Sequence, residues 1–179
     1  VLKDAYTSAL LTVETKCVNR QNAVFEINLS YKGELVLTYT QSATVEPIAK
    51  KVTNVRLWNF DNPELYKLDV LLIENGETLD SYVCNIGFRE ITKDKHRFMV
   101  NGRPVFLKGV CKHEMYNDSG HCPTETQMQE DMLKIKETGC NFVRLVHYPH
   151  NKKILDIADK IGLFVSEEPG RWWSDTSNP

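Results

Sequence analysis

The chain has 179 residues, of which 41% are hydrophobic and 26% are charged, and its formal net charge at neutral pH is −2. This composition is typical of a soluble globular protein, and the length allows one large domain or two small ones. The chain lacks the basic excess of a nucleic-acid-binding protein, and no apolar run approaches the roughly 20 residues of a membrane span. We therefore expect neither nucleic acid nor membrane as a partner. No leader peptide is visible, but the sequence starts at Val1 and not at Met, so this does not exclude export, and bacterial cytoplasm, periplasm and secretion all stay open.

The cysteine pattern argues against a disulfide-stabilised scaffold. The count is odd, the spacing is wide, and the chain is long enough to bury a core of its own. Free thiols are therefore predicted at all five positions, which are Cys17, Cys84, Cys111, Cys122 and Cys140.

The first half of the sequence has the two-residue period of half-buried β-strands. Phe25, Ile27 and Leu29, for example, alternate with polar residues and so belong to one face of a strand. Short strands separated by turns, without a helical period, predict an antiparallel, immunoglobulin-like sandwich over residues 1–92. The expected strands cover residues 23–31, 34–39, 66–73 and 79–83, with a hairpin turn at Asn75-Gly76.

The pattern changes near residue 92, where the polar stretch 92–96 is interpreted as a hinge. Residues 97–110 predict two strands joined by a turn at Asn101-Gly102. After them strands alternate with helices, which predicts a parallel sheet with right-handed crossovers in a second domain, residues 93–179. The expected helices cover residues 124–139 and 151–162, and the following strands cover 141–147 and 163–168.

Local signals define both ends of the first helix and the end of the second. Thr124 and Gln127 have the spacing of a capping box, and Gly139 suits the C-terminal cap. Ile154, Ile157, Ala158 and Ile161 form one apolar stripe of the second helix, which Gly162 ends.

Polar residues follow each of three consecutive strands, where α/β proteins bind their ligands. The three groups together favour a polar ligand with many hydroxyls or charges. These groups are Cys111-Lys112-His113-Glu114, His147-Tyr148-Pro149-His150 and Glu167-Glu168.

Each of these residues also has a purely structural interpretation. The histidines can be satisfied structural groups, the glutamates can belong to a solvated loop, and Arg144 can pair with Glu114 or Glu168 to compensate a buried charge. Arg171–Trp173 can be core or a platform for a sugar ring. Zinc binding is a minor alternative, because the spacing of the candidate ligands Cys111, His113, His121 and Cys122 is not a standard one.

Several blocks of the sequence resemble glycoside hydrolase family 2, the family of β-galactosidases, β-glucuronidases and β-mannosidases. The blocks are NPELYKLDVLL, IGFREI, VNGRPVFLKGVCKHE, NFVRLVHYP and SEEPG, in the family's order and spacing. The resemblance implies an immunoglobulin-like sandwich followed by the first three strands and two helices of a TIM (β/α)8 barrel. The chain would then be a central fragment of a larger enzyme.

The resemblance also implies a retaining exo-β-glycosidase, most similar to a β-galactosidase, that acts on a carbohydrate substrate through two carboxyl groups about 5 Å apart. Both catalytic glutamates are expected beyond residue 179, so no catalytic residue is assigned here and the fragment alone is expected to be inactive. By the same resemblance, Arg144 supports the missing nucleophile. His113, Glu114, His147 and Glu168 are the expected substrate-binding residues, with Glu114 as an indirect partner.

Other expectations concern specificity, cofactors and assembly. Cys111-Lys112 and Leu145-Val146 differ from the residues of well-known family members, so the sugar specificity stays open. Whether Trp172 and Trp173 contact the sugar also stays open. No cofactor is expected in this chain, while a divalent metal in the intact enzyme stays open. Open sheet edges predict self-association of the fragment or mobility of residues 100–179. The alternative function is a noncatalytic module that binds carbohydrate or protein.

Overall fold

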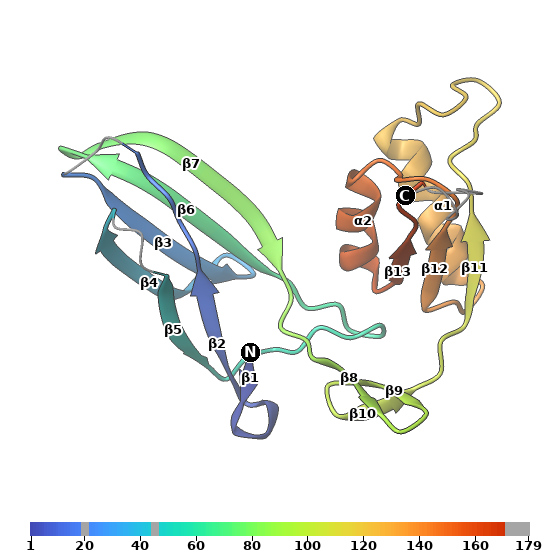
Figure 1. Ribbon diagram of the computed structural model, residues 1–179, viewed down its shortest axis with the longest axis horizontal. Coiled ribbons are helices and arrows are strands. Elements are labelled where there is room, and N and C mark those ends of the chain that lie inside the picture. Colours follow the sequence, from blue (N-terminus) through green and yellow to red (C-terminus); the bar gives the residue numbers. More distant parts are fainter. Residues whose placement is uncertain (19–21, 44–46, 171–179) are drawn as a thin grey trace, which may run out of the picture. The chain divides into compact units, whose positions relative to one another are not determined.

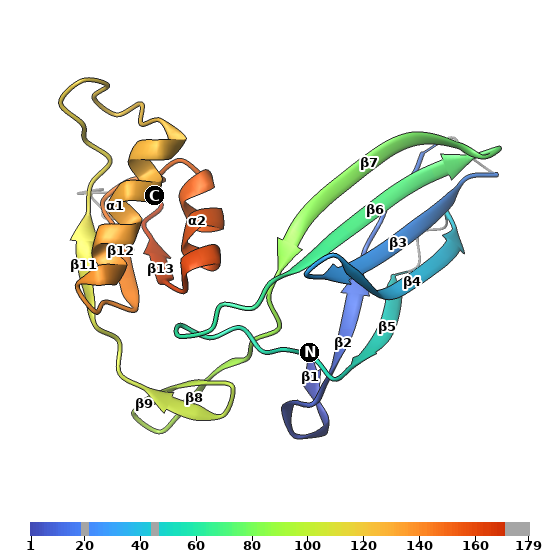
Figure 2. The ribbon, with the colours of Figure 1, turned by 180° about the vertical axis from the view of Figure 1, so that it is seen from behind.

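The computed structural model describes residues 1–18, 22–43 and 47–170 (Figures 1 and 2). The chain divides into two compact units. The first contains Val1–Trp58 and Glu64–Pro104, and the second contains Asn59–Pro63 and the chain from Val105 onward. Among the described residues, no helix has the length and apolar character that crossing a membrane requires. The division into an immunoglobulin-like domain over residues 1–92 and the first part of a TIM-barrel domain over residues 93–179 remains a proposal.

The larger sheet of the first unit consists of antiparallel strands in the order β4-β3-β6-β7 (Figure 1). All the strands expected from the two-residue period are confirmed. Asn75 and Gly76 join β6 to β7 with positive φ values of 53° and 83°, as the hairpin turn requires. The strands are β3 (Val24–Tyr31), β4 (Glu34–Ser42), β6 (Tyr66–Glu74) and β7 (Glu77–Ile86).

A smaller antiparallel sheet, in the order β1-β2-β5, shares its core with the larger one. Ala9 and Val52 of the small sheet belong to one buried cluster with Ile27, Leu29 and Tyr66 of the large sheet. Burial of apolar side chains between the two sheets therefore holds this unit together. The strands of the smaller sheet are β1 (Leu2–Lys3), β2 (Ser8–Val13) and β5 (Ile48–Thr53), and the 3₁₀ turn η1 (Asp4–Tyr6) joins β1 to β2.

The expected hinge at residues 92–96 is wrong, because this stretch is the first part of a β-hairpin. β8 (Ile91–Asp94) pairs with β9 (Arg97–Val100), and Lys95 takes a positive φ of 52° in the turn between them. Strand pairing uses backbone amide and carbonyl groups, so polar side chains do not prevent residues 92–94 from forming a strand. β10 (Arg103–Val105) completes this three-stranded sheet after the expected Asn101-Gly102 turn.

The second unit is a parallel sheet in the order β11-β12-β13 with two helices. As predicted, Thr124 and Gln127 form a capping box, and Gly139 and Gly162 follow the helices with left-handed φ values of 82° and 80°. Buried Met128 and Met132 of α1 share a core with α2 and the sheet. The elements are β11 (Gly109–Lys112), α1 (Glu125–Glu137), β12 (Phe142–Leu145), α2 (Lys153–Ile161) and β13 (Phe164–Glu167).

The strand expected through residue 110 is interrupted between β10 and β11. The side chain of Asn141 accepts a hydrogen bond from the Lys108 amide at 2.8 Å and donates one to the Phe106 carbonyl at 3.0 Å. These bonds replace strand pairing for the intervening residues. The amide side chain thereby positions the start of β11 against the start of β12.

The segment Asn59–Pro63 belongs to the second unit although it lies far away in the sequence. The Lys136 ammonium donates to the carbonyls of Phe60 at 2.6 Å and Gly162 at 2.8 Å, and the Phe60 ring contacts the Phe164 ring edge-on at 4.8 Å. These contacts hold the segment against the amino-terminal end of β13, opposite the polar strand ends.

Candidate functional site

The register of the parallel sheet brings the three polar strand ends to one edge. Lys112, Leu145 and Glu167 are direct neighbours across the strands. The residues that follow them therefore leave the sheet side by side. This edge contains the five residues predicted from sequence, Arg144, His113, Glu114, His147 and Glu168.

Arg144 lies on the face of β12 that the helices do not cover. Its neighbours along the chain, Val143 and Leu145, are fully buried in the helix-side core, so the intervening side chain points the other way. Arg144 shares its row with Cys111 and Ser166, and its side chain is 49% exposed. A guanidinium is thus compatible with this strand because one face is apolar and the other is open.

Glu168 joins Arg144 to His147. The Arg144 Nε donates to Oε1 of Glu168 at 2.7 Å, and a second guanidinium nitrogen contacts the same oxygen. The other oxygen, Oε2, lies 2.9 Å from Nδ1 of His147. A carboxylate only accepts, so Nδ1 carries the proton.

The charge of Glu168 is stabilised by this arrangement. The hydrogen bond from His147 and those from Arg144 lower the pKa of the Glu168 carboxyl, outweighing the opposite effect of desolvation. The same contact with Glu168 raises the pKa of Arg144. Of the two structural partners expected for Arg144, Glu114 and Glu168, the structure therefore shows Glu168. Support of a nucleophile by Arg144 remains a prediction.

Aromatic and imidazole rings line the same edge. The exposed His113 ring meets the His147 ring edge-on, with centroids 5.4 Å apart. Tyr148 lies 6.2 Å from the His113 centroid, and its hydroxyl lies 3.3 Å from Nδ1 of His121. The edge therefore presents several donors and acceptors beside flat ring surfaces, a combination that suits a hydroxylated ligand.

Glu114 differs from the other predicted residues because it is only 5% exposed. Its carboxylate accepts the amide hydrogen of Asn151, with oxygen distances of 3.2 and 3.4 Å, and its own amide donates to the Tyr148 hydroxyl at 3.1 Å. The side chain thus contacts the loop after β12 and not the open face of the sheet.

One buried network was missed from sequence. Lys112 is 7% exposed, and its Nζ lies 2.9 Å from Asp131 of α1 and 3.1 Å from both the Tyr116 hydroxyl and the His113 carbonyl. The signal available was a lysine at the strand position that should face the helices. A period-two assignment of β11 would have predicted a buried charge needing a partner.

Comparison with known proteins identifies the family. The model of "Glycosyl hydrolases family 2" matches residues 1–89, and that of "Glycosyl hydrolases family 2, TIM barrel domain" matches residues 90–171. The chain belongs to glycoside hydrolase family 2. The resemblance stated from its motifs is thereby confirmed, as is the expected start of a TIM-barrel domain in the second part of the chain.

Individual relatives of this family 2 chain carry two activity names. A putative β-glucuronidase of Formosa agariphila is 34% identical and covers 89% of the chain, and a β-galactosidase of Pseudoalteromonas haloplanktis is 35% identical and covers 65%. The crystal structure of Parabacteroides merdae β-glucuronidase superposes with a TM-score of 0.85 at 28% identity, covering 94% of this chain. The chain spans only 20%, 11% and 22% of these proteins, respectively.

The candidate metal ligands of this family 2 chain lie among the described residues, whereas the two adjacent tryptophans do not. Among the described residues, no three His, Cys, Asp or Glu side chains converge as metal ligands, and this includes the combination of Cys111, His113, His121 and Cys122. Trp172 and Trp173 lie outside the described residues, so their alternatives stay open.

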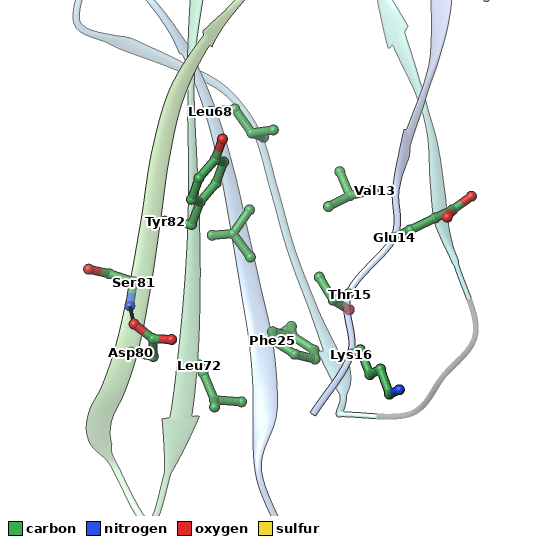
Figure 3. Close-up of a pocket in the computed structure, with 11 residues that line it drawn as sticks. Val13, Glu14, Thr15, Lys16, Phe25, Leu68, Leu72, Asp80, Ser81 and Tyr82 are labelled. Atoms are coloured by element: carbon green, nitrogen blue, oxygen red, sulfur yellow. Dashed lines mark hydrogen bonds between the residues drawn. The ribbon is translucent and has the colours of Figure 1, made fainter. Parts of the chain in front are cut away.

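The sandwich unit contains a separate cavity of about 300 Å³ (Figure 3). Phe25, Leu68 and Leu72 contribute apolar walls, and the charged residues Glu14, Lys16 and Asp80 are also among its lining residues. Its titratable groups do not form a hydrogen-bonded cluster like that around Glu168. The strand-end edge is therefore the better candidate for chemistry.

Proposed function

We propose that this chain belongs to a retaining exo-β-glycosidase that hydrolyses terminal β-glycosides. The observation that carries the proposal is the convergence of Arg144, His147 and Glu168 at the carboxyl edge of a parallel sheet, in a chain of glycoside hydrolase family 2. Within the intact enzyme, His113 and His147 contact sugar hydroxyls, and Arg144 supports the nucleophile. Such contacts accelerate the reaction when they strengthen at the transition state.

The acid/base and the nucleophile are assigned to barrel strands beyond the three of this chain. Glu168 is a poor general acid, because its neighbours lower its pKa and a proton donor needs a raised one. Glu114 is buried against the Asn151 amide and does not face the open side of Arg144. Neither glutamate is therefore placed in the catalytic pair.

Two sugars are candidates for the subsite that these residues form. A β-galactoside is the first candidate, because the resemblance stated from the motifs is to a β-galactosidase-type enzyme and relatives covering 65% and 93% of this chain are named β-galactosidases. A β-glucuronide is the second candidate, because one relative that covers 89% of this chain and a solved structure that covers 94% of it are named β-glucuronidases. A noncatalytic carbohydrate- or protein-binding module is the alternative from another class.

The test is hydrolysis of a panel of p-nitrophenyl β-glycosides by the full-length protein, measured beside the 179-residue chain. We expect the full-length protein to cleave one sugar and the shorter chain to cleave none. His147→Ala in the full-length protein should reduce kcat/KM by about 100-fold, since it removes a transition-state contact. His96→Ala, an exposed histidine of the β8–β9 hairpin, is the matched control and should leave kcat/KM unchanged.

Two results would contradict the proposal. A full-length protein that binds sugars without hydrolysing any member of the panel would favour the binding module. Turnover by the 179-residue chain itself would place the catalytic carboxylates within it and return Glu114 and Glu168 to consideration.

A further inference from the structure

The loop between β12 and α2 carries His147 at its start and the beginning of α2 at its end. Among the side chains that bond to the backbone of this loop are two glutamates that lie outside it. Within the loop, the Nε2–H of His150 donates to the Val146 carbonyl at 3.0 Å, and the His150 ring stacks on Tyr148 with centroids 4.9 Å apart. The bond between His150 and Val146 thus links the two sides of the loop around His147.

The two glutamates bind consecutive backbone amides of the loop. Oε1 of Glu167 accepts the His150 amide hydrogen at 3.0 Å, and the carboxylate of Glu114 accepts that of Asn151 at 3.2 Å. Glu114 follows β11 and Glu167 ends β13, so the acceptors come from the strands on either side of β12. Both amides lie within two residues of the α2 N-cap, Lys152, and the positive end of a helix dipole favours negative charge nearby.

The buried carboxylate of Glu114 is compensated by few polar contacts. Within the described part of the chain, this 5%-exposed carboxylate makes hydrogen bonds to the Asn151 amide and forms no ion pair with a lysine or arginine. Desolvating a carboxylate is unfavourable, and a single shared amide compensates it only partly. A role of the Glu114 side chain in fixing the position of the loop would explain why the protein tolerates the unfavourable desolvation of this carboxylate.

We propose that Glu114 and Glu167 are positioning residues that act through His147. By holding two consecutive amides from opposite sides, they fix the loop and so set the position of the His147 ring against Glu168. This inference rests on the proposed function, in which His147 contacts the sugar. Glu114 itself then makes no contact with substrate.

Kinetics of the full-length enzyme test the proposal. Glu114→Ala and Glu167→Ala should each lower kcat/KM by about 10- to 100-fold, mainly through kcat, because a displaced contact weakens binding of the transition state. Glu114→Gln and Glu167→Gln keep an oxygen that accepts the amide hydrogen, so they should stay within about fivefold of wild type. Glu130→Ala, an exposed glutamate of α1, is the control and should behave as wild type.

A double-mutant cycle decides whether the glutamates act through the histidine. If they do, adding Glu167→Ala or Glu114→Ala to the His147→Ala enzyme should lower its kcat/KM by less than about twofold. The proposal would be overturned if the glutamate and histidine substitutions lowered kcat/KM independently of each other. It would also be overturned if the glutamine variants were as impaired as the alanine variants. Alanine variants with wild-type kinetics would overturn it as well.

The design separates failure of this inference from failure of the proposed function. Inactive wild-type enzyme contradicts the function, whereas active wild-type enzyme with unaffected variants contradicts only the positioning role. Thermal unfolding of every variant identifies losses caused by misfolding. Glu167 is exposed, so Glu167→Ala opens no cavity and keeps the cycle decisive even if Glu114→Ala does not fold.

Discussion

At the scale of single residues, Lys112 illustrates how the site is tied to the scaffold. Its buried ammonium is compensated by Asp131 and by the Tyr116 hydroxyl, which itself donates to Asp131 at 2.8 Å. Burial and the bond to Asp131 raise the pKa of Tyr116, so the hydroxyl keeps its proton. Because Lys112 also donates to the His113 carbonyl, the network connects a predicted sugar-contacting residue to α1.

The pKa of Glu168 gives a prediction at the same scale. Its folded-state pKa lies below the ordinary value of 4.5, so its ionised form stabilises the folded chain above that pH. This contribution should be lost as the pH falls from 4.5 through the lower folded-state value. Chemical denaturation at several pH values should therefore give a steeper acid loss of unfolding free energy for wild type than for Glu168→Gln. Equal slopes for the two proteins would contradict the ion-paired state of Glu168.

At the scale of elements, two glycines end the two helices with nearly the same backbone conformation but different surroundings. A Cβ at Gly162 would lie 2.3 Å from the Phe60 carbonyl oxygen, whereas a Cβ at Gly139 would meet nothing within 4 Å. The difference exists because the Asn59–Pro63 segment packs against the end of α2. The glycine after α2 therefore serves both the turn and the close approach of another segment.

Alanine substitution separates these two requirements. Gly139→Ala should lower the free energy of unfolding by about 1 kcal/mol, the cost of a left-handed φ for an L-residue. Gly162→Ala adds a backbone clash and should lower it by about 3 kcal/mol. Urea denaturation of both variants measures the difference. Equal losses would mean that the Phe60 segment yields without cost.

At the scale of the whole molecule, the exposed apolar residues near β11 predict association of the 179-residue chain. Phe106 is 82% exposed, Val110 is 42% exposed and Met115 is 68% exposed, and β11 is an edge strand of its sheet. An open strand edge beside apolar side chains favours pairing with another copy. Sedimentation velocity should show concentration-dependent dimers or larger species.

Surface substitutions test where this association occurs. Phe106→Ser combined with Val110→Lys should shift the chain toward monomer, because the apolar contact is lost and a charge blocks the edge. Leu155→Ser changes an exposed leucine on helix α2, which offers no strand edge, and should leave the association as it is. A strictly monomeric wild-type chain would refute the prediction.

The sequence alone determined the features that depend on neighbouring residues. The two-residue period of β3 and β6, the capping box at Thr124 and the left-handed glycine after each helix are local signals, because each acts within a few residues. The polar ends of β11, β12 and β13 were also readable, since alternating strands and helices place those ends at one edge.

Only the tertiary structure decided which side chains meet there. Glu114, Glu167 and Glu168 are the same kind of residue at similar places, yet one lies under the Asn151 amide, one under the His150 amide and one between Arg144 and His147. Their directions follow from strand register and from the path of the loop after β12, which sequence spacing does not specify. The docking of Asn59–Pro63 and the pairing that makes residues 92–96 part of a hairpin are likewise set by contacts between distant segments.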